Sequence, residues 1–123
     1  MKFQLTDTYR YWWPVTVEMP DPEKPGKAVK QSFTVQFEAL GQDEGEAMNQ
    51  RIAALPEDEQ KQHKHEAILR VCKDWRDVTD ADGKPVPFSD EVLRQMLQYS
   101  WIRLAIYQAY ADSLVPGAAR KGN

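Results

Sequence analysis

Three aspartates and a glycine near the middle of the chain have the residue types of a metal site. They are Asp77, Asp80, Asp82 and Gly83, and aspartates spaced before a glycine occur in calcium-binding loops. When the glycine is aligned with the sixth position of such a loop, the first and twelfth positions fall on a valine and a serine instead of carboxylates. The pattern therefore favours a turn, pinned against the core by neighbouring apolar residues. These neighbours are Trp75, Val78, Val86 and Phe88.

Two histidines and a cysteine are further candidates for metal binding or nucleophilic chemistry. His63 and His65 lie two apart on a predicted helix, so they point to different sides and are expected to be solvated. Cys72 has no histidine beside it and is expected to be a small buried apolar residue, not a reactive thiol. A carboxylate pair could be imagined from Glu38 and Asp77, but nothing in the sequence places them together. The sequence thus indicates no catalytic residue, no metal site and no cofactor.

The totals describe one folded domain with a slightly acidic surface. The chain has 123 residues, a net charge of -3 and a pI near 5.4, which argues against a surface that binds nucleic acid. No apolar run is long enough to span a membrane, and the start of the chain lacks the pattern of a signal peptide. We expect a cytoplasmic protein with one domain over residues 1–115 and a flexible basic tail over residues 116–123.

Two strands are predicted in the first third of the chain. Apolar and polar residues alternate from residue 13 to residue 19 and again from 29 to 39, which is the period of a half-buried strand. Between them, residues 20–27 contain three prolines and a glycine, which predict a turn and hence a hairpin. Pro14 has no N–H to donate, so it suits an edge strand.

Helical signals fill the rest of the chain. A first helix is expected from the acidic residues after Gly41 up to Pro56, and a second from Pro56 to Trp75. Ser89 and Ser100 are the expected N-caps of a third and a fourth helix. The expected fold is α+β, with a small antiparallel hairpin at the N-terminus packed against about four helices. Four apolar residues at helical spacing end the second helix: Ile68, Val71, Cys72 and Trp75.

The last predicted helix is apolar on more than one side. One arc of it holds aliphatic residues, while Trp101, Leu104 and Tyr107 fall outside this arc. Either the whole helix is buried between the sheet and another helix, or the outlying residues meet a partner. Large aromatic and apolar residues are the usual anchors of interfaces. The candidate partner-binding residues are Trp12, Trp13, Trp101, Leu104 and Tyr107.

Four segments of the sequence together resemble the tail assembly chaperones of tailed bacteriophages. The most specific is W-R-D-V-T-D-A-D-G-K-P-V-P-F-S at residues 75–89, followed by W-I-R-L-A-I-Y-Q-A-Y at residues 101–110. The other two are W-P-V-x-V-x-x-P at residues 13–20 and S-F-T-V-Q-F at residues 32–37. The likeness spans nearly the whole chain.

This resemblance implies a non-enzymatic protein that binds the tape measure protein, keeps it soluble and recruits tail tube subunits. It also implies activity in the bacterial host cytoplasm and absence from the mature virion, and the chain would correspond to the short form made without a frameshift. Self-association is a further expectation. The alternatives are a minor structural component of the tail and a small metal-dependent hydrolase or nuclease that uses Asp77, Asp80 and Asp82.

Overall fold

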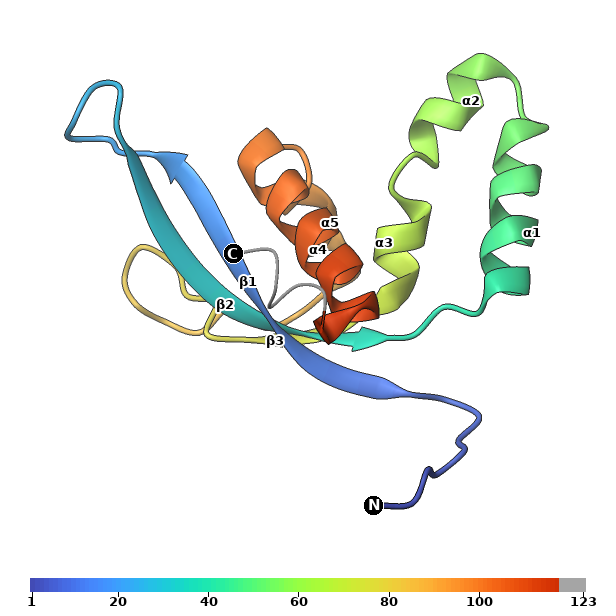
Figure 1. Cartoon of the computed structure of the whole chain (residues 1–123). Coiled ribbons are helices and arrows are strands. Elements are labelled where there is room, and N and C mark those ends of the chain that lie inside the picture. The colour runs from blue at the N-terminus through green and yellow to red at the C-terminus, as the bar shows by residue number, and fades with distance from the viewer. Residues whose placement is uncertain (118–123) are drawn as a thin grey trace.

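The fold is α+β and is built around a twisted three-stranded antiparallel sheet (Figure 1). The computed structural model describes residues 1–117. Its strands are β1 (Arg10–Pro20), β2 (Ala28–Glu38) and β3 (Cys72–Arg76), in the order β1-β2-β3. The predicted α+β class and the N-terminal hairpin are therefore confirmed, but the sheet contains a third strand that the sequence did not predict.

The hairpin of β1 and β2 follows the predicted alternation. Val15 lies opposite Phe33 and Trp13 opposite Val35 on the face that carries the core, while Thr16 lies opposite Ser32 on the other face. At the tip, Gly26 adopts a positive φ of 78°, a conformation that glycine reaches without a steric penalty. Because the side-chain period of a strand is two, this register buries one complete face of the hairpin.

Strand β3 corrects the prediction that Cys72 and Trp75 lie on a helix. Asp74 pairs with Gln36 and Cys72 pairs with Phe37, so Lys73 is an extra residue in a β-bulge. In a regular strand, residues three apart point to opposite faces, but the bulge restores the phase and both Cys72 and Trp75 are buried. The spacing that looked helical was therefore the spacing of a bulged strand.

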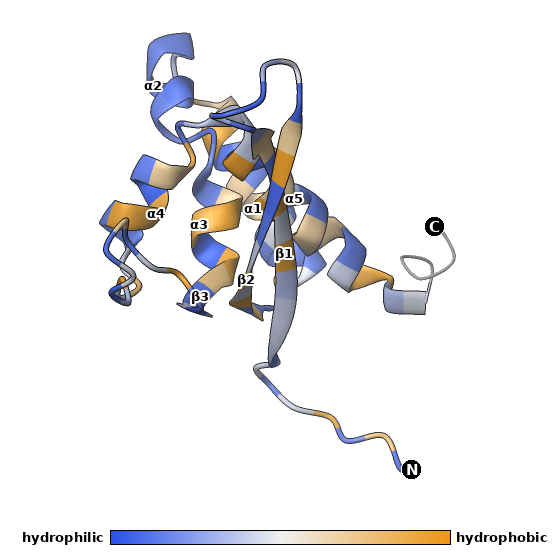
Figure 2. Ribbon diagram, turned by 90° about the vertical axis from the view of Figure 1, so that its left-hand side faces the viewer, coloured by the Kyte–Doolittle hydropathy of each residue, from blue (hydrophilic) through white to orange (hydrophobic). Residues whose placement is uncertain are grey.

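The segment between β2 and β3 contains three helices instead of the two that were predicted. The predicted helix from Pro56 to Trp75 is divided by a turn at residues 63–65 and ends where β3 begins. The polar part is exposed as expected and hydrophilic throughout (Figure 2). Its Gln60 side-chain amide donates to the carbonyl of Ala53, the last residue of the preceding helix, at 3.3 Å, and to the carbonyl of Leu55 just after that helix at 2.8 Å. The three helices are α1 (Gln42–Ala53), α2 (Glu57–Gln62) and α3 (Glu66–Val71).

The last two helices are α4 (Asp90–Met96) and α5 (Ser100–Leu114). The predicted cap of α4 is confirmed, because the Ser89 hydroxyl accepts a bond from the backbone N–H of Val92 at 3.1 Å. The predicted cap of α5 is wrong: Ser100 is its first residue, and Tyr99 is the N-cap without a side-chain bond. The helix ends before Pro116, and residues 118–123 of the predicted basic tail lie outside the described residues.

The core lies between one face of the sheet and helices α3, α4 and α5 (Figure 1). Helix α5 crosses β1, where Ile106 is fully buried. The expected packing of helices on one face of the sheet is confirmed for these three, while α1 and α2 stand beside them. The buried members of the core are Val15, Val17, Phe33, Val35, Phe37, Ile68, Val71, Cys72, Trp75, Leu93, Leu97, Ile106 and Ala109.

Arginine side chains fasten the end of the hairpin to α1 and α3. Arg70 donates through two nitrogens to the carboxylate of Glu44, at 2.8 and 3.0 Å, and a third nitrogen lies 2.8 Å from Glu38. On the other side of Glu38, Arg10 donates at 2.9 Å. A forked guanidinium fixes carboxylate orientation better than a point charge does, so Arg70 sets the position of α1 relative to the sheet.

We expect the protein to become less stable as the pH falls below about 4.5, partly through Glu38. The hydrogen bond from Arg10, aided by the charges of Lys73 and Arg70 and opposed by burial, lowers the pKa of Glu38 below its usual 4.5. A carboxyl whose pKa is lower in the folded state than in the unfolded state stabilises the folded protein when the pH is above its unfolded-state pKa. This contribution is lost as the pH falls through the folded-state pKa. Urea unfolding from pH 7 to pH 3 should therefore show a weaker pH dependence for Glu38→Gln than for the wild type.

The control for removing one charge is Glu57→Gln, at an exposed carboxylate in the first turn of α2. A Glu38→Gln profile that runs parallel to the wild-type profile at every pH would contradict this role of Glu38.

Candidate functional site: a groove between β1 and α5

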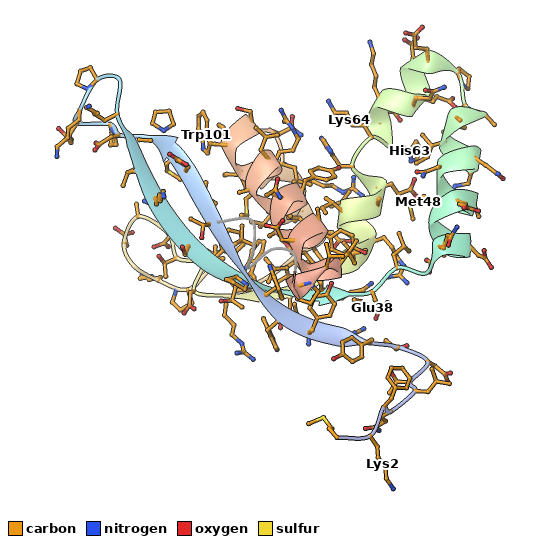
Figure 3. The ribbon with its side chains drawn as sticks, in the orientation of Figure 1. Lys2, Glu38, Met48, His63, Lys64 and Trp101 are labelled. Carbon is orange, nitrogen blue, oxygen red and sulfur yellow. The ribbon has the colours of Figure 1, made fainter. Side chains whose placement is uncertain are left out.

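A groove runs between the outer edge of β1 and one side of α5. Its volume is about 1110 Å³. Figure 3 shows Trp101 at the start of α5, on the side that faces the end of β1. Because Tyr11 near the start of β1 bonds Ser113 near the end of α5 at 2.7 Å, strand and helix run in opposite directions along the groove. The lining residues are Trp13, Pro14, Thr16, Glu18, Ser100, Trp101, Leu104, Ala105, Gln108, Ala109, Asp112 and Pro116.

The β1 wall presents unpaired backbone groups. At the two ends of the hairpin, Ala39 N–H donates to the carbonyl of Tyr9 at 3.0 Å, and Asp21 N–H donates to the carbonyl of Lys27 at 2.9 Å. Tyr9 and Asp21 are both odd-numbered. Residues that bond the neighbouring strand alternate with residues that point away from it, so the odd-numbered residues of β1 bond β2. The even-numbered residues therefore direct their N–H and C=O groups to the free edge. Pro14 is one of them and has no N–H, which confirms its predicted edge role.

The α5 wall is apolar at one end and polar at the other. At its start, Trp101 is 36% exposed and Leu104 is 66% exposed, and the Trp101 ring stacks on Tyr99 with centroids 5.7 Å apart. Further along, Gln108 and Asp112 line the groove and bond each other at 2.8 Å. With Glu18 on the opposite wall, the groove offers apolar contacts, backbone hydrogen-bond groups and two carboxylates. This combination suits an extended or helical polypeptide segment.

The structure brings together three of the five candidate partner-binding residues. Trp13, Trp101 and Leu104 all line the groove. Trp12 lies on the opposite face of the sheet, where the Arg76 guanidinium sits 3.7 Å from its ring centroid. Tyr107 lies elsewhere on α5, with its hydroxyl 3.2 Å from Nδ1 of His65. Neighbouring tryptophans in a strand alternate between faces, so the structure places Trp12 apart from the three candidates that line the groove.

His65 is packed against α5, which corrects the prediction that both histidines are solvated. Its ring centroid lies 6.2 Å from that of Tyr107. Burial, aided by the charges of Lys64 and Arg103, lowers the pKa of His65, and burial raises the pKa of Tyr107. His63 is partly exposed, with its ring 3.4 Å from the carboxylate of Glu66. His65 therefore packs against α5, and His63 contacts Glu66 at the start of α3.

The three aspartates form the predicted turn. One carboxylate oxygen of Asp80 accepts bonds from the backbone N–H groups of Asp82 and Lys84, at 2.9 and 3.0 Å. Gly83 takes a positive φ of 81°, and Asp77 is a non-glycine residue with a φ of 64°. Within residues 1–117, no three His, Cys, Asp or Glu side chains lie close enough together to hold a metal ion.

The cysteine has the predicted buried, apolar environment. Cys72 is 2% exposed, and burial, with a smaller effect of Asp90, raises the pKa of its thiol to about 12. At neutral pH the side chain is therefore a thiol that packs in the core, since reactivity requires the thiolate.

Sequence reasoning missed the polar part of the groove, namely Thr16, Glu18, Gln108 and Asp112. The strand residues carried a usable signal, because Pro14 marked an edge strand and thus its free backbone groups. The helix residues carried none, since polar residues on a helix normally face water. A second, smaller hollow of about 480 Å³ was also missed and is lined by Val92, Gln95, Met96, Gln98, Tyr99 and Ile102.

Comparisons with protein-family models, with curated proteins and with solved structures found no match to this chain. Among residues 1–117, none of the helices combines the length and the hydrophobicity that crossing a membrane requires.

Proposed function

We propose that this protein is a tail assembly chaperone of a tailed bacteriophage or prophage, in the short form. In this proposal it binds the tape measure protein in the host cytoplasm, keeps that protein soluble and helps to recruit tail tube subunits. It acts by binding alone, without catalysis, and leaves before the virion is complete. The resemblance of residues 75–89 and 101–110 to such chaperones supports this function.

The groove between β1 and α5 is the observation that carries the proposal. Trp13, Trp101 and Leu104 form an apolar surface along it, and exposed apolar surface of this kind is usual for recognition of an amphipathic helix. Its volume of about 1110 Å³ is larger than the usual range for small-molecule sites. The carboxylates of Glu18 and Asp112 favour a partner helix with basic residues beside its apolar stripe.

Coexpression of the tape measure protein with a Trp101→Ala, Leu104→Ala variant tests the proposal. The wild type should keep the tape measure protein in the soluble fraction, and the variant should not. Since central aromatic and apolar anchors dominate binding, we expect the dissociation constant for an amphipathic tape measure segment to rise by about 100-fold or more.

Trp12→Ala is the matched control, because it removes a tryptophan from the opposite face of the sheet. It should leave binding and solubility near the wild-type level. Circular dichroism establishes that both variants fold. Unchanged solubility of the tape measure protein with the folded double variant would refute the role of the groove.

A minor structural component of the tail is the second candidate. The free edge of β1 favours it, because an unpaired strand edge is a ready surface for association between copies. Mass spectrometry of purified virions separates the two functions. A chaperone should be missing from them, whereas a structural component should be present in a fixed ratio to the tube protein.

A further inference from the structure

Residues 1–6 form an extended arm that leaves the domain at the end of β1 opposite the hairpin tip (Figure 1). Phe3 is 88% exposed and Leu5 is 86% exposed. Along the arm, Met1, Phe3 and Leu5 alternate with polar residues, and Figure 2 shows orange and blue alternating along this N-terminal segment. This is the period of a strand with one buried face. The arm therefore has the pattern of a strand but lacks a sheet and an apolar surface to cover it.

The groove supplies both of these features. Its β1 wall is a free strand edge, and its α5 wall exposes Trp101 and Leu104. We propose that the arm of one copy of this protein adds as a fourth strand to the free edge of β1 in a second copy, antiparallel to it. Phe3 and Leu5 then lie against the apolar wall of α5. Main-chain hydrogen bonds supply affinity in this mode of recognition, and alternate side chains supply specificity.

Charge and side-chain direction select one register for this pairing. When Lys2 lies opposite Glu18, the two opposite charges meet on the outer face of the sheet, where Glu18 is exposed. In that register Phe3 lies beside Val17 and Leu5 beside Val15. Both valines are on the buried face, which is the face that α5 covers. A shift by one residue would turn Phe3 and Leu5 to solvent.

The arm cannot reach this position in its own chain. In the selected register Thr6 lies beside Pro14, and the rise along β1 from Tyr9 to Pro14 is about 17 Å. The chain from Thr6 to Tyr9 spans at most about 11 Å even when fully extended. A tight turn of two or three residues within one chain would set Lys2 opposite Trp13 or Pro14, short of Glu18. An arm that pairs in this register therefore belongs to another copy.

Reciprocal exchange of two arms gives a closed two-fold dimer, since each copy offers one arm and one groove. In Figure 3, Lys2 marks the far end of the arm, well away from the Trp101 that it approaches in the partner copy. The inference does not rest on the function proposed above, because it needs no tape measure protein and is tested without one. Both proposals use the groove beside Trp101 and Leu104, so in any one copy the arm and a tape measure segment would exclude each other.

The first test is the oligomeric state of the full chain by sedimentation velocity over a range of concentrations. The wild type should be a dimer that dissociates on dilution. The variant Phe3→Ser, Leu5→Ser should raise the dimer dissociation constant by at least about 100-fold, since it removes the apolar anchors of both arms. The matched control is Gln4→Ser, Thr6→Ser on the other face of the arm, which should change the constant by less than about fivefold, since exposed polar substitutions have small effects.

The register is tested by cross-linking two single-cysteine variants, Gln4→Cys and Thr16→Cys, which the proposed register sets opposite each other. Under mild oxidation their mixture should give a covalent heterodimer, while Gln4→Cys mixed with Ser32→Cys, one strand further in, should give little. The buried Cys72 is present in all three proteins. A monomer at every concentration, a dimer insensitive to the Phe3 and Leu5 variant, or equal cross-linking in both mixtures would overturn the proposal.

Discussion

Trp75→Ala should destabilise the protein by about 3 to 5 kcal/mol, the usual cost of removing a large aromatic residue from a core. Trp75 is 7% exposed and its ring packs edge-on against Phe88, with centroids 4.9 Å apart. Its indole N–H donates to the carbonyl of Val86 at 2.7 Å. The side chain thus joins β3 to the connection that leads to α4, and the substitution removes the packing and the hydrogen bond together.

Urea unfolding at one fixed protein concentration measures this loss, and Trp75→Phe separates its two parts. Phenylalanine keeps an aromatic ring but leaves the Val86 carbonyl without its donor, which should cost about 1 to 3 kcal/mol. Trp12→Ala is the control on the outer face, where loss of the contact with Arg76 should cost about 1 kcal/mol or less. Equal losses for Trp75→Ala and Trp12→Ala would show that Trp75 does not have this structural role.

Phe37→Ala should be similarly costly, by about 3 to 5 kcal/mol, and should also loosen α5. Phe37 is fully buried, and its ring meets Tyr110 of α5 edge-on at 5.2 Å and Tyr11 of β1 at 6.0 Å. A cavity at this point removes the surface that holds α5 against the sheet. The width of the groove depends on the contacts of Phe37 with Tyr110 and Tyr11, because α5 and β1 are the two walls of the groove.

Two measurements address this prediction. Urea unfolding gives the free energy, and amide hydrogen exchange should show that α5 loses protection more than the central part of β2 does. Phe37→Leu retains most of the volume and should cost clearly less. A free-energy loss below about 1 kcal/mol for Phe37→Ala, or a uniform loss of protection, would contradict the role of Phe37 in holding α5.

Local patterns explain which parts of the fold could be predicted. The hairpin was predictable because the period of two between residues 13 and 39 matches a sheet with one buried face. The start of α4 was predictable because Ser89 and the acidic residues after it act on their own helix. In both cases the residues that determine the structure are close in sequence.

Strand β3 could not be predicted in the same way. Its residues Cys72 and Trp75 are three apart, which fits a helix, and only the bulge at Lys73 makes that spacing compatible with a strand. The bulge exists because β2 offers a free edge, and β2 is distant in sequence. Pairing with that edge satisfies backbone groups of both strands and outweighs a local helical preference.

The candidate site shows the same division. The sequence by itself determined that Trp101 and Leu104 lie outside the main apolar arc of the last helix, and that Pro14 belongs on an edge strand. Only the tertiary structure decided that these features face each other across one groove, with Trp13 inside it and Trp12 and Tyr107 outside it. The physical reason is that a helix or strand sets which residues share a face, whereas the packing of α5 across β1 sets which faces meet.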